Sequence, residues 1–292
     1  MPDEIKRIPS LPVDSLEQVR LIVRRALDED VGDGDVTTLC TIPEQATSQG
    51  QFLAKADGIV AGLAVAQLTF ALVDGRVHMQ DHVADGDPVR KGQIISHIEG
   101  PTQPLLVGER VALNFLQRMS GIATLTRRFV EAVRGTRATI LDTRKTAPGL
   151  RLIDKWAVRL GGGQNHRSGL YDMVLIKDNH LAAVGSLTEA VQRVRMMDSR
   201  RRPIEVEVKS LAELDEALQL NVDRILLDNM DLATLREAVQ MACGRTPLEA
   251  SGNITLENVA DVAATGVDFI SAGSLTHSVR ALDISLEISD AT

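Results

Sequence analysis

The chain has 292 residues, of which 44% are hydrophobic, 25% charged and only 2% aromatic, and its formal net charge is −8. These fractions are those of a soluble globular protein, and they exclude disordered, collagen-like and fibrous classes. An acidic chain with so few stacking side chains is a poor candidate for nucleic-acid or anionic-membrane binding. The apolar stretches are too short to span a bilayer.

The N-terminus and the cysteines indicate the compartment. Residues 1–10 lack the apolar segment of a signal peptide, and Cys40 and Cys243 form no CxxC pair. We therefore expect a cytoplasmic protein without structural zinc.

The N-terminal part predicts helices around short strands. Ser15 and Gln18 have the spacing of a capping box, so a first helix is predicted to begin after Ser15. This helix is predicted to end at the glycines of EDVGDGDVTT. Residues 50–108 predict an antiparallel α+β module with one apolar helix inside it. The DGDPVRKGQ segment also occurs in carrier domains, but here it lacks a lysine at a hairpin tip. A long helix is predicted over 105–132, despite Gly121.

Beyond residue 135 the pattern changes to strands alternating with helices. The six strand candidates are ATILDTRK, DMVLIKDN, IEVEVKS, DRILLDN, LEASGNI and VDFISAG. Near-continuous apolar strands separated by helices indicate a parallel sheet that is buried on both faces. Six units are too few for an eight-stranded barrel, so we expect an incomplete (β/α) barrel, with an open doubly wound sheet as the alternative.

Polar residues gather where these strands end. In parallel α/β folds the active site lies at the carboxyl ends of the strands, because the loops converge there. A single polar pair after a strand is usually a turn or a cap, whereas six such strand ends favour a site. The residues at these ends are Asp142, Arg144, Lys145, Lys177, Asp178, Asn179, His180, Glu205, Glu207, Lys209, Asp228, Asn229, Ser251, Gly252, Asn253, Gly273 and Ser274.

Charge and glycine usage indicate the kind of ligand. Residues 137–177 carry eight basic against three acidic residues, a local charge of +5 in an acidic chain. We interpret Arg151, Lys155 and Arg159, at helical spacing, as a solvated helix face. The cations at the strand ends predict a substrate with several carboxylates or phosphates. Glu207 and Asp228 suit a divalent cation or sugar hydroxyls.

The GGGQNHR segment at 161–167 is compatible with an anion site, because His166 and Arg167 directly follow the glycines. Neither a Walker A nor a GxGxxG motif is present.

At this point the motifs resemble those of the quinolinate phosphoribosyltransferase family. The similarity lies in DTRKTAPGLR and DKWAVRLGGGQNHRSGLYDMVLIKDNH, and it continues through EDVGDGDVTT, GERVALNFLQRMSGIAT, EVEV, LLDNM, EASGNIT and SAGSLTHSVRALDISL. The resemblance implies decarboxylating transfer from 5-phosphoribosyl 1-diphosphate (PRPP) to quinolinate, with Mg²⁺. The products are nicotinate mononucleotide, diphosphate and CO₂, in de novo NAD biosynthesis.

The resemblance also implies the architecture. We expect an α/β fold with an N-terminal α+β sandwich domain at 1–115, followed by an incomplete (β/α) barrel of six or seven parallel strands at 116–276. The tail at 277–292 is expected to pack back on the first domain. The family assembles as a homodimer with a site shared across the interface, and a higher oligomer stays open.

Residue roles follow from the matched motifs. The resemblance assigns Arg144, His166, Arg167 and Lys177 to the two quinolinate carboxylates, joined by Arg110 from the partner subunit. Lys145, Glu207 and Asp228 are the catalytic residues, facing PRPP and its diphosphate, with Glu207 and Asp228 on Mg²⁺. The remaining substrate-binding positions are Thr143, Ser251, Gly252, Asn253, Ala272, Gly273 and Ser274, with the last six around the 5-phosphate.

Three alternatives stay open at this stage. A related phosphoribosyltransferase would use a different anionic base. A barrel aldolase would use Lys177 as a Schiff-base lysine, which leaves the arginines without a role. A non-catalytic anion sensor would gain from losing Glu207 and Asp228, yet both are present.

Overall fold

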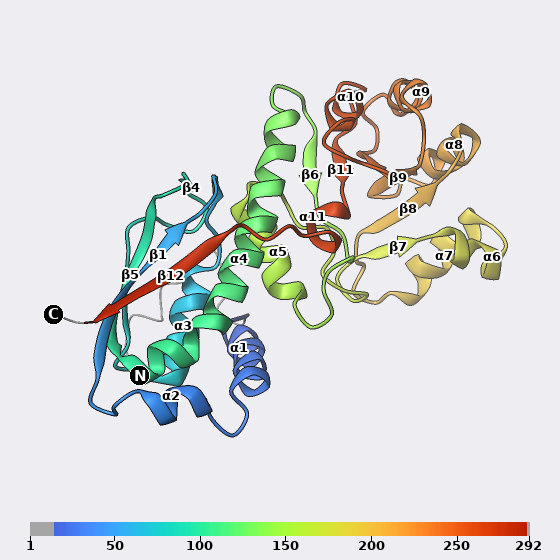
Figure 1. Ribbon diagram of the computed structural model, residues 1–292. Coiled ribbons are helices and arrows are strands. Elements are labelled where there is room, and N and C mark those ends of the chain that lie inside the picture. The colour runs from blue at the N-terminus through green and yellow to red at the C-terminus, as the bar shows by residue number, and fades with distance from the viewer. Residues whose placement is uncertain (1–14, 291–292) are drawn as a thin grey trace. The chain divides into compact units, whose positions relative to one another are not determined.

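The computed structural model describes residues 15–290, which form two compact units (Figure 1). Of the described residues, the first unit takes 15–125, 147–162 and 279–290, and the second takes 126–146 and 163–278. Helix α4 (Thr102–Ala132) runs through the expected domain boundary at 115/116 and contributes to both units. None of the helices in the described residues is long and apolar enough to cross a membrane.

The first unit is built on an antiparallel sheet in the order β12-β1-β5-β3, with a separate pair formed by β2 and β4. The last strand, β12, pairs with β1 from Ser48↔Asp290 to Ala54↔Ile284, so the end of the chain completes the first sheet. The strands are β1 (Thr47–Ala54), β2 (Gly58–Ile59), β3 (His78–Asp81), β4 (Pro88–Val89), β5 (Ile94–Pro101) and β12 (Ile284–Asp290).

Helices α1 (Leu16–Val31), α2 (Val36–Thr41), α3 (Leu63–Val73) and α5 (Arg151–Leu160) complete this unit. The apolar segment that predicted a helix is α3, and its Phe70 meets Phe52 of β1 edge to face in the core. The predicted first helix is α1, with Val19, Val23 and Leu27 buried. The capping box is not formed, because Ser15 has helical dihedral angles and its side chain makes no cap hydrogen bond.

Helix α5 corrects one interpretation of the sequence. Lys155 is only 4% exposed, and its neighbours Asp154 and Trp156 are buried as well. The prediction of a solvated face is therefore wrong at Lys155, although Arg159 is exposed. Helical spacing alone does not show which side chains of α5 are covered by the rest of the first unit, where the neighbouring Asp154 pairs with Arg118 of α4.

The second unit is a sheet of six strands that all run parallel, in the order β6-β11-β10-β9-β8-β7. From β7 to β11 the spatial order follows the chain without reversal, whereas a doubly wound sheet reverses at a switch point. The expected incomplete (β/α) barrel is therefore confirmed. Its strands are β6 (Thr139–Leu141), β7 (Val174–Ile176), β8 (Ile204–Val208), β9 (Arg224–Asp228), β10 (Leu248–Ser251) and β11 (Phe269–Ser271).

The helices that follow these strands are short, and several have side-chain N-caps. Ser186, Ser210 and Asp231 each accept the backbone N–H three residues on, which satisfies one of the free donors at a helix start. The helices are α6 (Asp178–Val184), α7 (Leu187–Met197), α8 (Leu211–Gln219), α9 (Leu232–Ala242), α10 (Val259–Ala263) and α11 (Ser274–His277).

Candidate active site

Strand register places the polar side chains on one face of the parallel sheet. Glu205 lies opposite Arg224, and Glu249 lies opposite Leu226, two residues further along β9. Because side chains alternate between faces, these residues share one face with Glu207 and Asp228. The intervening residues, such as Val206 and Ile225, are buried and apolar and occupy the other face. The polar face therefore leads toward the carboxyl ends of the strands.

The exit of β6 is tied to the glycine-rich segment. Asp142 is fully buried, and its carboxylate accepts the His166 backbone N–H at 2.9 Å and the Asn165 side-chain amide at 2.6 Å. Leu141 forms a parallel bridge with Gln164, so residues around 164 extend this edge of the sheet. Asp142, which the sequence marked only as a strand-end residue, thus holds the segment that carries His166 and Arg167.

Lys145 joins the exits of β6 and β11. Its backbone carbonyl accepts the hydroxyl of Thr276 at 2.9 Å, and Thr143 Oγ1 accepts the Lys145 N–H at 3.0 Å. The Lys145 side chain lies against Gly273, where a Cβ atom would stand 3.0 Å from Lys145 Cδ. The small residue at position 273 therefore leaves room for this exposed lysine.

Arg144 and Arg167 lie close enough for their charges to interact. The pKa of the Arg167 guanidinium is lowered, first by burial and then by the positive charge of Arg144. The Arg167 side chain also donates to the Met173 carbonyl at 3.2 Å, which holds it near the start of β7. Two neighbouring, partly buried cations form an environment that favours a bound anion.

Ion pairs connect the exits of β7 and β8. The Lys177 ammonium pairs with the Glu207 carboxylate, and Lys209 pairs with Asp178 at 2.7 Å. The Lys209 interaction lowers the pKa of Asp178. Asp228 ends the neighbouring strand β9 and is half-buried. The structure thus brings together Lys177 and Glu207, which the resemblance assigns to different substrates.

The exits of β9 and β10 form a tight loop pair. Asn229, Gly252 and Asn253 all have positive φ, and Asn253 donates to the Asn229 side chain at 2.9 Å. A Cβ atom at Gly252 would lie 2.6 Å from Asn229 Oδ1, so only glycine fits. A cavity of about 330 Å³ adjoins these residues and is also lined by Ser251.

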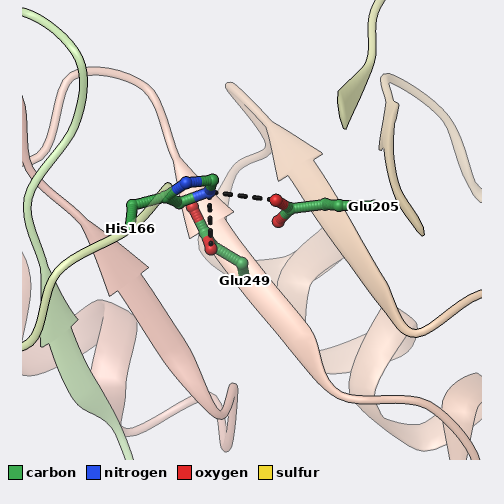
Figure 2. Close-up of side chains that lie close together, drawn as sticks. All are labelled: His166, Glu205 and Glu249. Carbon is green, nitrogen blue, oxygen red and sulfur yellow. Dashed lines mark ion pairs between the residues drawn. The ribbon is translucent and has the colours of Figure 1, made fainter. Parts of the chain in front are cut away.

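A buried ionic cluster lies deeper on the same face (Figure 2). His166 Nε2 stands 2.9 Å from Glu205 Oε2 and 3.5 Å from Glu249 Oε2, and Arg224 donates to Glu249 at 3.0 Å. Burial and the neighbouring Glu205 raise the pKa of Glu249 to about 7, and burial also raises the pKa of Glu205. We refer to Arg224, Glu249, Glu205 and His166 as the floor cluster.

The sequence prediction missed Glu249 and Arg224. The available signal was a charged residue at an inward position of a strand, such as Glu249 between Leu248 and Ala250. Arg110 is exposed on α4 in the first unit, whereas the other predicted site residues belong to the second.

The fold and these residues define the class of protein: an incomplete (β/α) barrel with cations and carboxylates at its strand exits. The family model "Quinolinate phosphoribosyl transferase, N-terminal domain" matches residues 35–120, and that of the C-terminal domain matches residues 122–287. The chain belongs to the quinolinate phosphoribosyltransferase family.

Individual relatives agree with this assignment. A quinolinate phosphoribosyltransferase [decarboxylating] 1b of Nicotiana tabacum is 48% identical over 95% of this chain and 84% of its own length. A probable nicotinate-nucleotide pyrophosphorylase [carboxylating] of Bacillus subtilis is 44% identical over 93% of both chains. The crystal structure of NadC from Streptococcus pyogenes has a TM-score of 0.92 at 40% identity, covering 98% of this chain and all of the other.

Proposed function

We propose that this chain transfers the phosphoribosyl group of PRPP to quinolinate with loss of CO₂, as a step of NAD biosynthesis. The products are nicotinate mononucleotide and diphosphate. Family membership supports this reaction. The observation that carries it is the neighbouring, partly buried pair Arg144 and Arg167, which together supply charge for a dicarboxylate.

In this proposal the quinolinate carboxylates are held by Arg144, Arg167 and Lys177, with His166 beside them. A dianion that enters a site enclosed by protein loses hydration, so it needs several cations to replace the lost water contacts. Lys177 is paired with Glu207 in the structure and would exchange this partner for a quinolinate carboxylate.

The PRPP side is formed by the neighbouring strand exits. Lys145, Glu207 and Asp228 would face the ribose and the diphosphate, with Thr143 beside Lys145. The 5-phosphate would lie on the backbone of the two loops after β10 and β11, where small residues let N–H groups approach an anion. These loop residues are Ser251, Gly252, Asn253, Ala272, Gly273 and Ser274.

The same carboxylates fit Mg²⁺. Glu207 and Asp228 lie on one face at the ends of neighbouring strands, because Glu207 is opposite Leu226 and Asp228 follows two residues later. Mg²⁺ is usually held by one or two carboxylates together with substrate phosphates. Bound there with PRPP, it would offset the charge that grows on the departing diphosphate.

The chemistry requires orientation and charge more than a nucleophilic side chain. The quinolinate nitrogen forms a bond to ribose C1 while the C1–O bond to diphosphate breaks, and Lys145 stabilises the negative charge on that oxygen. The ring nitrogen is then cationic. The adjacent carboxylate leaves as CO₂, its electron pair stays on the ring carbon beside this nitrogen, and a proton takes its place. The residues around the ring hold it in the reacting orientation and exclude water.

We also propose that the active form is a homodimer in which Arg110 enters the partner's site. Arg110 is exposed and lies in the first unit, where it is available to a second copy of the chain. Two-fold dimers are the commonest assembly, and they bring the same patch of each chain to its partner reciprocally.

The reaction is tested by incubating the purified protein with quinolinate, PRPP and Mg²⁺ and measuring nicotinate mononucleotide by chromatography. Product should accumulate only when all three are present. A matched reaction with Lys145→Ala protein controls for a contaminating enzyme. Absence of product from folded wild-type protein would contradict the proposed function.

A further inference from the structure

The floor cluster lies inside the sheet, below the exits where the substrates are proposed to bind. Glu205 and Glu249 are each the second residue of their strands, β8 and β10, and both are fully buried. Arg224 begins β9 between them, where its guanidinium also covers the Phe269 ring at 4.0 Å. The cluster is therefore held on three neighbouring strands, which is a rigid support.

The imidazole of His166 is held at both ring nitrogens. Nδ1 accepts the backbone N–H of Arg167 at 2.7 Å, so Nδ1 carries no proton. Nε2 must then carry the proton, and it points to Glu205 Oε2 at 2.9 Å and Glu249 Oε2 at 3.5 Å (Figure 2). Two carboxylate oxygens in front of Nε2 thus favour the tautomer whose Nδ1 can accept from Arg167.

A metal ion is the other chemistry that these three side chains allow, since their ligand atoms lie within 4.8 Å of one another. The geometry favours the ion-paired cluster instead. His166 Nε2 already lies 2.9 Å from Glu205 Oε2, and the Arg224 guanidinium supplies a positive charge to Glu249 at 3.0 Å.

We propose that the Glu205–Glu249 pair positions the quinolinate site, because it fixes the tautomer and orientation of His166 and, through Nδ1, the backbone of Arg167. This inference rests on the proposed function. The contacts run from Arg224 to Glu249, from Glu249 to His166, and from His166 Nδ1 to the backbone N–H of Arg167. The guanidinium of Arg167 in turn lies beside that of Arg144. Glu205 and Glu249 need not touch the substrate themselves.

The test uses Glu205→Gln and Glu249→Gln, which keep the shape of each side chain and replace one carboxylate oxygen by an amide donor. An amide NH₂ that faces Nε2 is a donor, so it favours the tautomer in which Nε2 carries no proton. The ring proton then moves to Nδ1, which can no longer accept the Arg167 N–H. We expect the quinolinate dissociation constant to rise about tenfold to a hundredfold, as when other partners that orient a functional histidine are lost. The KM for PRPP should change less than about twofold.

Two readouts separate positioning from general damage. The first is calorimetric binding of quinolinate, and the second is the ¹⁵N NMR spectrum of histidine-labelled protein. The chain has six histidines, and His166→Gln identifies the signal of His166. Wild type should show the Nε2–H tautomer, and the variants should lose it.

Asp85→Asn is the matched control, because it removes a half-buried carboxylate that accepts two backbone N–H groups at the start of α3 in the first unit. It should lower stability and leave quinolinate binding unchanged. Arg224→Lys is a milder second variant if a glutamine variant does not fold, and it should weaken quinolinate binding by a smaller factor.

The inference would be overturned if the His166 tautomer changed while quinolinate affinity stayed at the wild-type value. It would also be overturned if quinolinate binding and PRPP kinetics worsened together, in line with lost stability, as in a general folding defect. Failure of the proposed function has a different signature, because wild-type protein itself would then neither bind nor turn over quinolinate.

Discussion

Arg118 and Asp154 form a two-point ion pair: Arg118 Nε donates to Oδ1 and Nη2 to Oδ2, both at 2.8 Å. Asp154 is fully buried and also accepts the Ala147 N–H at 3.1 Å. Arg118 lies on α4 and Asp154 on α5, so this pair joins residues 147–162 to the rest of the first unit.

Loss of this pair should be costly for stability. Arg118→Met removes the cation and leaves a buried carboxylate uncompensated, which typically costs about 3–5 kcal/mol. Urea unfolding of wild type and variant measures the difference. Arg118→Lys is the control for charge alone and should recover only part of the loss, because a lysine cannot make both bonds. A change below about 1 kcal/mol in Arg118→Met would contradict the importance of the pair.

The floor cluster makes stability depend on pH. Glu249 has a pKa of about 7 in the folded chain, against an ordinary value of 4.5, so the folded state holds its proton more tightly than the unfolded state. This contribution to stability is fully present below about pH 4.5 and is lost as the pH rises through about 7. The stability of wild type relative to Glu249→Gln should therefore fall from pH 5 to about 7.5. Unfolding curves at each pH measure this difference, and a difference that stays constant or rises over this range would contradict the raised pKa of Glu249.

The fold was predictable where local pattern and packing agree. Strands such as β9 are near-continuous apolar segments, and helices with their own N-caps separate them, so their order along the chain predicts a parallel sheet. Because the carboxyl ends of parallel strands meet at one edge of the sheet, the sequence also predicts that Lys177 and Glu207 belong to one site. The pairing of these two side chains follows directly from the adjacency of β7 and β8.

The remaining features depend on register and long-range packing, which a single sequence does not display. Glu249 reaches Arg224 because of the pairing Leu248↔Ile225, and a one-residue slip would turn Glu249 to the opposite face. Lys155 is buried because α5 packs with residues far away in the chain. The capping box at Ser15 does not form because Ser15 itself has helical dihedral angles, which the spacing of Ser15 and Gln18 does not reveal.

Lys145 should matter for turnover more than for binding of quinolinate. Its side chain lies against Gly273, on the proposed PRPP side of the site. Lys145→Ala should lower kcat by about 10²–10³, the usual effect of removing one donor that stabilises developing charge. Quinolinate affinity, measured by calorimetry, should change far less. A defect confined to quinolinate binding would instead place Lys145 in the carboxylate pocket.

Arg110 should act across the subunit interface. Arg110→Ala and Lys145→Ala proteins should each be nearly inactive alone. When their subunits are exchanged, each heterodimer holds one site with both residues intact, so activity should return to about a quarter of wild type for statistical mixing. Exchange is verified with two affinity tags. If exchange occurs and activity stays absent, Arg110 works within its own chain.

The central claim is decarboxylating transfer to a dicarboxylate, and release of labelled CO₂ measures it most directly. Quinolinate labelled in the carboxylate next to the ring nitrogen is incubated with PRPP, Mg²⁺ and the enzyme, and labelled CO₂ is counted against nicotinate mononucleotide. We predict one CO₂ per nucleotide, with no release when PRPP is omitted. Nicotinate supplies one carboxylate where the pocket has charge for two. Its transition state should therefore be less stabilised by about 2–5 kcal/mol, which lowers kcat/KM at least roughly thirtyfold. Equal turnover of nicotinate, or nucleotide formed without CO₂, would contradict the account.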